Sequence, residues 1–344
     1  MNASASSAIS KPQSDDHAIW DLIFSFWGSP ALLVAHDLKL FSLLGERPQR
    51  LEEVCAALKI EPRPASVLLE MLTAFGLVDA RDGVFALTPI SKEYLDEKSP
   101  ISLGGYLDFL VANHKLWSVE TLKNAVLKNS PQVGGNKDVF SNPETMKAFA
   151  KVFTRAMYAH SIGSALTWPE AVDLSEARVL LDVGGGSGAQ TVGVLLQWPN
   201  LKGIVLDTPP VTAEATQYIS RFPLGDRIRT VAADMFKDPF PEADVHLYGD
   251  IWHDWPKEKG ELLAKKSYAS LPSGGRIILR EVLYNDDRTG PVAAAAYSVD
   301  MLLVTMDGQY SRKEMKALLE DAGFRDVQIG APGAGYRSLI TARK

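Results

Sequence analysis

One short stretch combines small residues and acids in a pattern typical of nucleoside binding. The run Asp182-Val183-Gly184-Gly185-Gly186-Ser187-Gly188 follows an apolar segment and precedes a helix-forming one. Glycines let a ligand approach the backbone closely, and a helix N-terminus offers free N–H groups. Asp207 lies 19 residues after Gly188, at the end of the next apolar segment, where a carboxylate can bind ribose hydroxyls. The spacing predicts a nucleoside-type cofactor.

Two cofactors are compatible with this loop. The pattern Gly-x-Gly-x-x-Ala at 184–189 satisfies the dinucleotide fingerprint, so NAD is one of them. Asp182, at the strand end, suits a cationic or amino-acid-bearing ligand better than a pyrophosphate. Asp234 follows the third expected strand, and the next residues, Met235 and Phe236, can flank an adenine. These acids favour S-adenosylmethionine over NAD.

The elements that must position this loop alternate in type. After Pro169, short β-branched runs alternate with helical segments, and the chain ends in two strands joined by a short turn. This alternation predicts an α/β fold with a mostly parallel sheet, helices on both faces and a C-terminal β-hairpin. Between 19 and 110 the periodicity is helical, and the order helix, turn, helix and strand-like 84–88 outlines a winged helix.

Composition narrows the class of protein. The 344 residues carry a formal net charge of −6, which disfavours binding to nucleic acid backbones. The single cysteine, Cys55, excludes an internal disulfide framework and a cysteine-built metal site, and we expect no metal. We find no apolar run near the roughly 18 residues of a membrane span. Residues 1–16 lack the apolar core of a signal peptide and are expected to be a disordered tail. We therefore expect a cytoplasmic protein without a membrane partner.

Four motifs, taken together and in order, give the chain a family resemblance. They are the 182–188 run, Asp234-Met235-Phe236, His253-Asp254-Trp255 and the terminal Leu318-Leu319-x-x-Ala322-Gly323-Phe324. The chain resembles the S-adenosylmethionine-dependent small-molecule O-methyltransferases of the plant caffeate and microbial hydroxyindole type, from about residue 17 to 344.

The resemblance implies a domain order. A tail at 1–16 would precede a winged-helix dimerisation domain at 17–110, which we expect to be all-helical. A helical linker with the acceptor-pocket helices would span 111–168. A class I methyltransferase domain with a Rossmann-like sheet would occupy 169–344. The family also implies a homodimer through the N-terminal domain. Ile19, Trp20 and the apolar residues that follow them expose too much surface for a monomer.

The resemblance also assigns the catalytic residues. His253 matches the general base that takes the proton of the acceptor hydroxyl, and Glu281, 28 residues later, matches the carboxylate that orients it. The family's second carboxylate lies 13 residues before Ala322, where this chain has Gln309. A glutamine can form hydrogen bonds but cannot stabilise an imidazolium by charge. This departure bears on the acceptor more than on the cofactor.

The family's binding residues carry over in two groups. The cofactor group implied here is Asp182, Gly184, Gly186, Asp207, Asp234, Met235, Trp255 and Ser161. The acceptor group is Phe153, Met157, His160 and Asp254. For Phe153 and Met157 a core-packing role fits the helical spacing equally well.

The sequence leaves the acceptor atom open. A hydroxyl acceptor would use His253 as base. A small thioether acid such as methylthio-hydroxybutyrate would lose no proton and would tolerate Gln309, giving a sulfonium product. Methylation of nitrogen or carbon is a further alternative. A winged-helix DNA-binding regulator is disfavoured because its recognition stretch, 61–69, has one arginine and then turns apolar.

Overall fold

The computed structural model describes residues 11–133 and 143–344, with the side chains of 143–148 left out. Residues 1–10 of the expected tail lie outside the described residues, and residues 11–16 form no regular element. The chain divides into two compact units, 1–99 and 100–344. The division falls before the expected boundary at 110 because helix α7 (Gly104–Ala112) packs on helix α9 (Pro143–Ala165).

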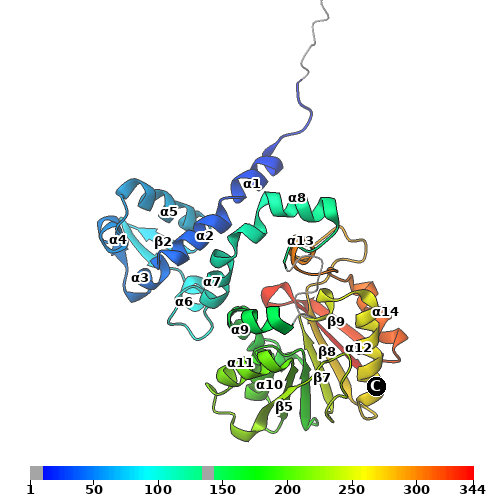
Figure 1. The fold of residues 1–344 in the computed structure, drawn as a ribbon. Coiled ribbons are helices and arrows are strands. Elements are labelled where there is room, and N and C mark those ends of the chain that lie inside the picture. The colour runs from blue at the N-terminus through cyan, green and yellow to red at the C-terminus, as the bar shows by residue number, and fades with distance from the viewer. Residues whose placement is uncertain (1–10, 134–142) are drawn as a thin grey trace, which may run out of the picture. The chain divides into compact units, whose positions relative to one another are not determined.

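The first unit combines helices with a small sheet (Figure 1). Its elements are α1 (His17–Ser25), α2 (Gly28–Asp37), α3 (Leu40–Glu46), β1 (Gln49–Arg50), α4 (Leu51–Leu58), α5 (Pro62–Ala74), β2 (Val78–Arg81), β3 (Val84–Leu87) and α6 (Pro89–Tyr94). The strands form an antiparallel sheet in the order β1-β3-β2. Asp82 and Gly83 join β2 to β3 with φ of 50° and 73°, the backbone that a two-residue hairpin requires. The winged-helix outline is present, but the expectation of an all-helical unit is wrong for this sheet.

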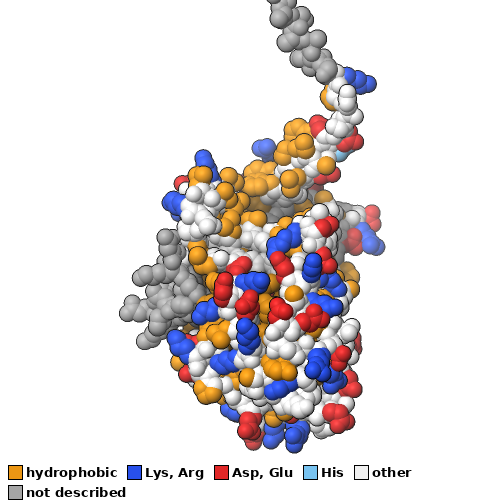
Figure 2. Space-filling view, turned by 90° about the vertical axis from the view of Figure 1, so that its right-hand side faces the viewer, with side chains coloured by type: hydrophobic (Ala, Val, Ile, Leu, Met, Phe, Trp, Pro, Cys, Tyr) orange, Lys and Arg blue, Asp and Glu red, His pale blue; other side chains and the backbone are white. Residues whose placement is uncertain are grey.

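Helix α1 has an apolar surface that its own unit leaves uncovered. None of its residues is buried, and Leu22 and Phe24 expose 74% and 61% of their surface. Figure 2 shows these hydrophobic side chains on the segment that follows the tail. By length and composition, one helical stretch of the described chain, His17–Asp37, could cross a membrane, so our expectation of no such run is wrong. Two elements divide that stretch, since α1 ends at Ser25 and α2 begins at Gly28.

The second unit is built on a seven-stranded sheet of order β6-β5-β4-β7-β8-β10-β9. Strands β4 to β8 run parallel, whereas β10 is antiparallel to both β8 and β9. The strands are β4 (Val179–Val183), β5 (Lys202–Asp207), β6 (Ile228–Ala232), β7 (Val245–Gly249), β8 (Arg276–Glu281), β9 (Arg325–Pro332) and β10 (Ser338–Arg343). The order reverses between β4 and β7, and open parallel sheets bind ligands at the carboxyl ends of strands at such a point. The expected sheet and its C-terminal hairpin are confirmed.

Helices cover both faces of this sheet (Figure 1). Helices α10 (Ala189–Gln197) and α11 (Pro209–Ile219) pack on one face, and α12 (Lys257–Ser270) and α14 (Arg312–Asp321) pack on the other. The unit also contains α7, α9, α8 (Val119–Lys128) and α13 (Val292–Val304). Single turns of 3-10 helix lie at η1 (His114–Trp117), η3 (Pro169–Ala171), η4 (Gly225–Arg227), η5 (Trp252–Asp254) and η6 (Ala334–Tyr336).

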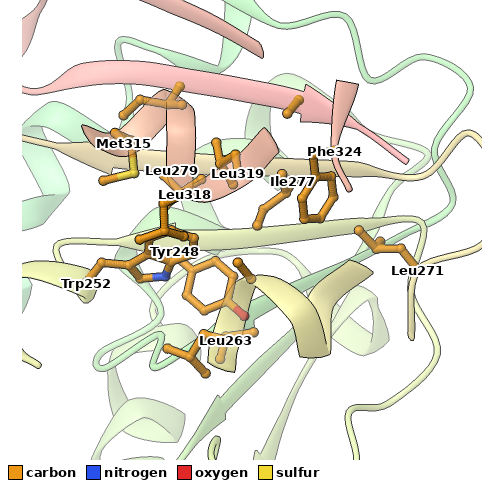
Figure 3. Close-up of a cluster of buried hydrophobic side chains, with 14 of the residues drawn as sticks. Tyr248, Trp252, Leu263, Leu271, Ile277, Leu279, Met315, Leu318, Leu319 and Phe324 are labelled. Atoms are coloured by element: carbon orange, nitrogen blue, oxygen red, sulfur yellow. The ribbon is translucent and has the colours of Figure 1, made fainter. Parts of the chain in front are cut away.

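Neighbouring strand residues pack into opposite cores. Leu180 and Ile278 pack with α10 and α11, whereas Leu181 and Leu279 pack with α12 and α14. Successive strand side chains point to opposite faces, so a strand buried on both faces reads as a continuous apolar run. Figure 3 shows the second core, in which Tyr248 and Trp252 meet residues of α12 and α14. These two cores hold the strand ends rigidly.

Candidate active site

A cavity of about 1300 Å³ lies in the second unit at the carboxyl ends of β4 to β7. It is lined by all the binding residues expected from the sequence and by His253. Glu281 lies behind His253 and does not line the cavity, and Gln309 is also absent from the lining residues among the part of the chain described. The structure therefore gathers the expected cofactor and acceptor residues into one space.

The glycine loop leaves the end of β4 in a conformation that suits glycine. Gly184, Gly186 and Gly188 have φ of 69°, 55° and 78°. The amide of Gly184 donates to the carbonyl of Leu206 at 2.8 Å, which ties the loop to β5. A Cβ on Gly184 would lie 2.6 Å from Ile251 Cδ1, whereas one on Gly186 would meet no protein atom closer than 4.0 Å. Since Gly186 lines the cavity, a side chain there would take up ligand space.

Asp182 offers a buried negative charge to this loop. Its Oδ2 accepts a 2.7 Å hydrogen bond from Thr191 Oγ1, and its Oδ1 is buried with no partner among the described residues. Burial raises the pKa of Asp182 to about 7, and the nearby charge of Asp207 adds to the rise. An ammonium group would satisfy the free oxygen and hold the carboxylate ionised. A ligand that carries an amino group could therefore bind at Asp182.

Asp207 ends β5 and is fixed by main-chain groups. Its Oδ2 accepts from the amide of Gly186 at 2.9 Å, and its Oδ1 accepts from the amide of Thr208 at 2.7 Å. Burial raises the pKa of Asp207, although these hydrogen bonds oppose the rise. Oδ1 also accepts from Thr208 Oγ1 at 3.3 Å. Oδ2 has one donor among the described residues, so it retains a lone pair to which a ribose hydroxyl can donate.

The third strand and the turn after β7 form an aromatic wall. Phe236 meets Trp255 edge to face with ring centroids 4.7 Å apart, and Lys259 Nζ lies 4.2 Å from the Phe236 centroid. Asp234 accepts from the amide of Phe236 at 2.9 Å and pairs with Lys237 at 2.8 Å. Met235 and Trp255 both line the cavity, so flat apolar surfaces are available to an adenine ring.

His253 and Glu281 form a buried pair at the carboxyl ends of β7 and β8. His253 Nδ1 lies 2.5 Å from Glu281 Oε2, and both residues are almost fully buried. Glu281 Oε1 accepts from the amide of Trp252 at 2.8 Å and from that of Ile251 at 3.1 Å. The carboxylate is therefore held by the backbone that carries the histidine. It holds Nδ1 and leaves Nε2 for a ligand.

Two further acids lie near the imidazole. Asp254 Oδ1 lies 3.5 Å from His253 Nε2. An oxygen of Asp250, a ring nitrogen of His253 and an oxygen of Glu281 lie within 4.8 Å of one another. Burial acts to lower the pKa of His253, but the charges of Glu281 and Asp254 outweigh it and raise the pKa to about 10. The spacing would suit a cation, but Arg337 and the His253–Glu281 hydrogen bond already engage these groups.

Arg337 neutralises Asp250. Its Nε donates to Asp250 Oδ1 and Oδ2 at 2.8 and 2.6 Å, and its Nη2 lies 3.0 Å from His160 Nε2. Burial and the Arg337 cation lower the pKa of His160 to about 4, so His160 is neutral at pH 7. The sequence analysis missed Asp250 and Arg337. Asp250 follows a strand end, as Asp182 and Asp207 do, and that signal could have found it; no local pattern marks Arg337.

Aromatic and polar residues of three helices enclose the acceptor end. Phe153, Met157, His160 and Ser161 of α9 line the cavity with Phe109 of α7. Two residues of α13 that the sequence analysis missed, Tyr297 and Asp300, also line the cavity. The ring of Tyr297 meets that of His253 at 5.3 Å. The pocket beside the imidazole is thus suited to a flat apolar molecule.

Gln309 is the expected residue that the structure does not bring to the cavity. It is 2% exposed, its amide N–H donates to Ser298 Oγ at 3.2 Å, and its side-chain amide has no partner among the described residues. We see no hydrogen bond from Gln309 to His253 in the described chain. The spacing from Ala322 located the residue in the sequence but could not define the direction of its side chain.

Comparison with known proteins covers both units. The O-methyltransferase domain matches residues 119–325, and the O-methyltransferase dimerisation domain matches 20–97. The 3-hydroxy-5-methyl-1-naphthoate 3-O-methyltransferase of Streptomyces sahachiroi is 35% identical over 324 residues, 91% of this chain and 92% of that protein. The tetracenomycin 8-O-methyl transferase TcmO of Streptomyces glaucescens is 31% identical over 336 residues, 95% of this chain and 96% of that protein. The crystal structure of human N-acetylserotonin methyltransferase with S-adenosylmethionine has a TM-score of 0.81 at 28% identity, covering 97% of this chain and 99% of that one.

Proposed function

This chain belongs to the S-adenosylmethionine-dependent O-methyltransferases of small molecules, and on that premise we propose that His253 is the general base that activates an aromatic hydroxyl acceptor. The observation that carries the proposal is the position of His253, which lines the cavity while Glu281 holds its Nδ1. The thioether-acceptor and DNA-binding alternatives find no support in these comparisons.

We assign cofactor binding to the part of the cavity lined by the glycine loop, the end of β5 and the segment that follows β6. Asp182 would pair with the ammonium of the methionine moiety, Asp207 would accept from a ribose hydroxyl, and Met235 with Trp255 would enclose the adenine. Gly186 leaves room for the ligand at the loop, and Ser161 lines the same space from α9. When bound, S-adenosylmethionine supplies an electrophilic methyl group on a positively charged sulfur. The positive charge also suits a cavity in which several carboxylates are buried.

His253 would move the proton. With Nδ1 held by Glu281, Nε2 is the nitrogen that would take the proton of the acceptor hydroxyl while the methyl group passes from sulfur to oxygen. The raised pKa of His253 makes it a strong base but keeps it protonated at pH 7 in the protein alone. A bound positive charge in the same cavity disfavours an imidazolium, so we expect cofactor binding to lower this pKa. The Glu281 carboxylate then stabilises the imidazolium that forms when the acceptor loses its proton.

The acceptor would be a flat aromatic alcohol. Phe109, Phe153, Met157 and Tyr297 supply apolar surface around His253, and aromatic ligands pack well against such walls. Asp254, which also lines the cavity, would contact the acceptor near the reacting hydroxyl. Methyl transfer needs the hydroxyl oxygen, methyl carbon and sulfur in line, so these walls would act mainly by orientation.

We also propose a cytoplasmic homodimer assembled through the first unit. The match to the dimerisation domain and the exposed apolar face of α1 support this assembly. The domain limits expected at 17–110, 111–168 and 169–344 remain predictions. Light scattering at micromolar concentration should give twice the chain mass of 37.5 kDa, and a mass equal to one chain would contradict the dimer.

Transfer of a labelled methyl group tests the proposed function. The full-length protein is incubated with methyl-labelled S-adenosylmethionine and separate panels of phenols, thiols, thioethers and amines. Label should enter the phenol panel, at the oxygen by mass spectrometry. Label confined to thioethers or amines would contradict the proposed role of His253.

A further inference from the structure

A half-buried carboxylate at the acceptor end of the cavity has one oxygen that accepts no hydrogen bond from the described residues. Asp300 lies on α13 and lines the cavity. Its Oδ1 accepts a 2.6 Å hydrogen bond from Trp117 Nε1, which fixes the carboxylate plane. Among the described residues, no hydrogen bond donor or basic side chain reaches Oδ2. Burial raises the pKa of Asp300, and the Trp117 hydrogen bond and the charge of His253 partly offset that rise.

The position of Asp300 relative to the base follows from the helix. Tyr297, one turn earlier on α13, meets the His253 ring at 5.3 Å. Residues three apart lie on the same face of a helix, about 4.5 Å apart along its axis. Asp300 therefore lies beyond Tyr297 on the face that meets His253. A molecule that presents a hydroxyl to His253 would reach Asp300 with a more distant part of its structure.

No basic residue in the described part of the chain forms an ion pair with Asp300. Lys237 is paired with Asp234, and His253 is paired with Glu281. His160 is neutral beside Arg337. His114 and Lys115, which also line the cavity, are exposed to solvent. A half-buried carboxylate that forms no ion pair among the described residues gains from a ligand that supplies a hydrogen bond donor.

Resting on the proposed function, we propose that Asp300 binds a hydrogen bond donor on the acceptor, distant from the hydroxyl that is methylated. The acceptor is then an aromatic alcohol that carries an amine or a second hydroxyl at its other end. A carboxylate at that end is disfavoured, because it would face Asp300 without a paired cation. Phe109 and Trp117, whose rings are 5.9 Å apart, flank this end of the pocket.

A series of four hydroxynaphthalenes tests the proposal by binding. They share one ring system and carry an aminoethyl, hydroxyethyl, ethyl or carboxyethyl group on the ring distant from the hydroxyl. Titration calorimetry on full-length protein saturated with S-adenosylhomocysteine measures affinity without turnover. The aminoethyl and hydroxyethyl compounds should bind more tightly than the ethyl compound, and the carboxyethyl compound most weakly. A preference for the aminoethyl over the hydroxyethyl compound identifies a cationic donor, and equal affinities identify a neutral one.

The variant Asp300→Asn should invert this order. The Trp117 N–H requires an oxygen acceptor, so the amide NH₂ of Asn would point to the cavity and offer a donor where the wild type offers an acceptor. The affinity ratio of aminoethyl to carboxyethyl compound should fall about 10- to 100-fold, the range for a hydrogen bond to a charged group. Asp307→Asn is the matched control, because Asp307 bonds the amide of Gly308 and does not line the cavity. Its ratio should stay at the wild-type value.

The outcomes separate this inference from the function on which it rests. A ratio that Asp300→Asn leaves unchanged, in a protein with wild-type thermal midpoint, overturns the role of Asp300. Failure of all four compounds to bind overturns it too. Failure of methyl transfer to any phenol, with the binding order intact, overturns the proposed function instead.

Discussion

Glu281 holds His253 through one carboxylate oxygen and holds the backbone of Trp252, the residue before it, through the other. The same carboxylate thus fixes both the ring nitrogen and the turn that carries the ring. The turn follows β7 and the carboxylate ends β8, which are adjacent parallel strands. Orientation of the base is therefore a property of the sheet and does not depend on a flexible loop.

Replacing Glu281 should prevent His253 from accepting a proton but should leave cofactor binding intact. In Glu281→Gln the amide oxygen would accept from the Trp252 amide and the NH₂ would face His253 Nδ1. Nδ1 must then accept, so the ring proton moves to Nε2, which can no longer take a proton. We expect kcat to fall by about 10²-fold or more, with cofactor affinity retained in calorimetry. Glu320→Gln, at an exposed i,i+4 pair, is the control; equal kcat in both variants would contradict this role.

The Arg337–Asp250 pair should set the pH at which the base works. Burial opposes ionisation of Asp250, but Arg337 holds the pKa of Asp250 below its ordinary value, so its charge is present and neutralised. Arg337→Met would remove the buried cation beside Asp250 and His253, raise the pKa of His253 and shift the rising limb of kcat to higher pH. Asp250→Asn would lower the same pKa and shift the limb to lower pH. Profiles of kcat against pH from 5 to 10 test this prediction. If both variants shifted the rising limb in the same direction, the Arg337–Asp250 pair would not set the pKa of His253.

Asp207 should contribute directly to cofactor affinity. Asp207→Ala removes a carboxylate that can accept from a ribose hydroxyl, and we expect weaker binding of S-adenosylmethionine by about 1.5–3 kcal/mol. Calorimetric titration of variant and parent gives this value. Asp226→Ala, at the exposed turn η4, should bind as the parent does. An unchanged affinity in Asp207→Ala would contradict the ribose assignment.

His246 should make the fold sensitive to acid. It is 1% exposed on β7, both ring nitrogens lack a partner among the described residues, and burial lowers its pKa to about 3. In the unfolded chain His246 is protonated below about pH 6.5, whereas in the folded chain it stays neutral down to about pH 3. The contribution of His246 to the free energy of unfolding is therefore fully present above about pH 6.5 and is lost as the pH falls toward 3. The loss is about 1.4 kcal/mol per pH unit. Urea unfolding at pH 7 and 5 should show that the free energy of unfolding falls less in His246→Leu than in the parent. An equal fall in both proteins would contradict the role of His246.

Local sequence patterns predicted the sheet and those residues that line the cavity from the glycine loop and from the segment after β6. Apolar β-branched runs mark buried parallel strands. The stretch from Asp182 to Gly188 spans the end of β4 and its connection to α10, and the stretch from Asp234 to Phe236 lies in the connection between β6 and β7. Ser311 caps α14, since its hydroxyl accepts from the backbone amide of Glu314 three residues later. These features depend on residues near one another in the sequence, so a single sequence contains their signal.

The acceptor half depends on contacts between distant segments. Arg337 reaches Asp250 because the next residue, Ser338, pairs with Glu281 in the antiparallel register of β10 with β8. Asp300 meets Trp117 through two helices separated by most of the chain. No local periodicity encodes either contact. The direction of the Gln309 side chain is set in the same way, by what packs around it.

The pH dependence of His253→Ala tests the central claim, that His253 takes the proton of an acceptor hydroxyl. With the best phenol from the labelled panel, single-turnover rates are measured for variant and parent between pH 6 and 10. We predict a loss of about 10²–10⁴-fold near pH 7, the range for a general base. The loss should shrink toward pH 10, where a phenol ionises near its own pKa of about 10. A deficit that stays constant across the whole range would contradict the account.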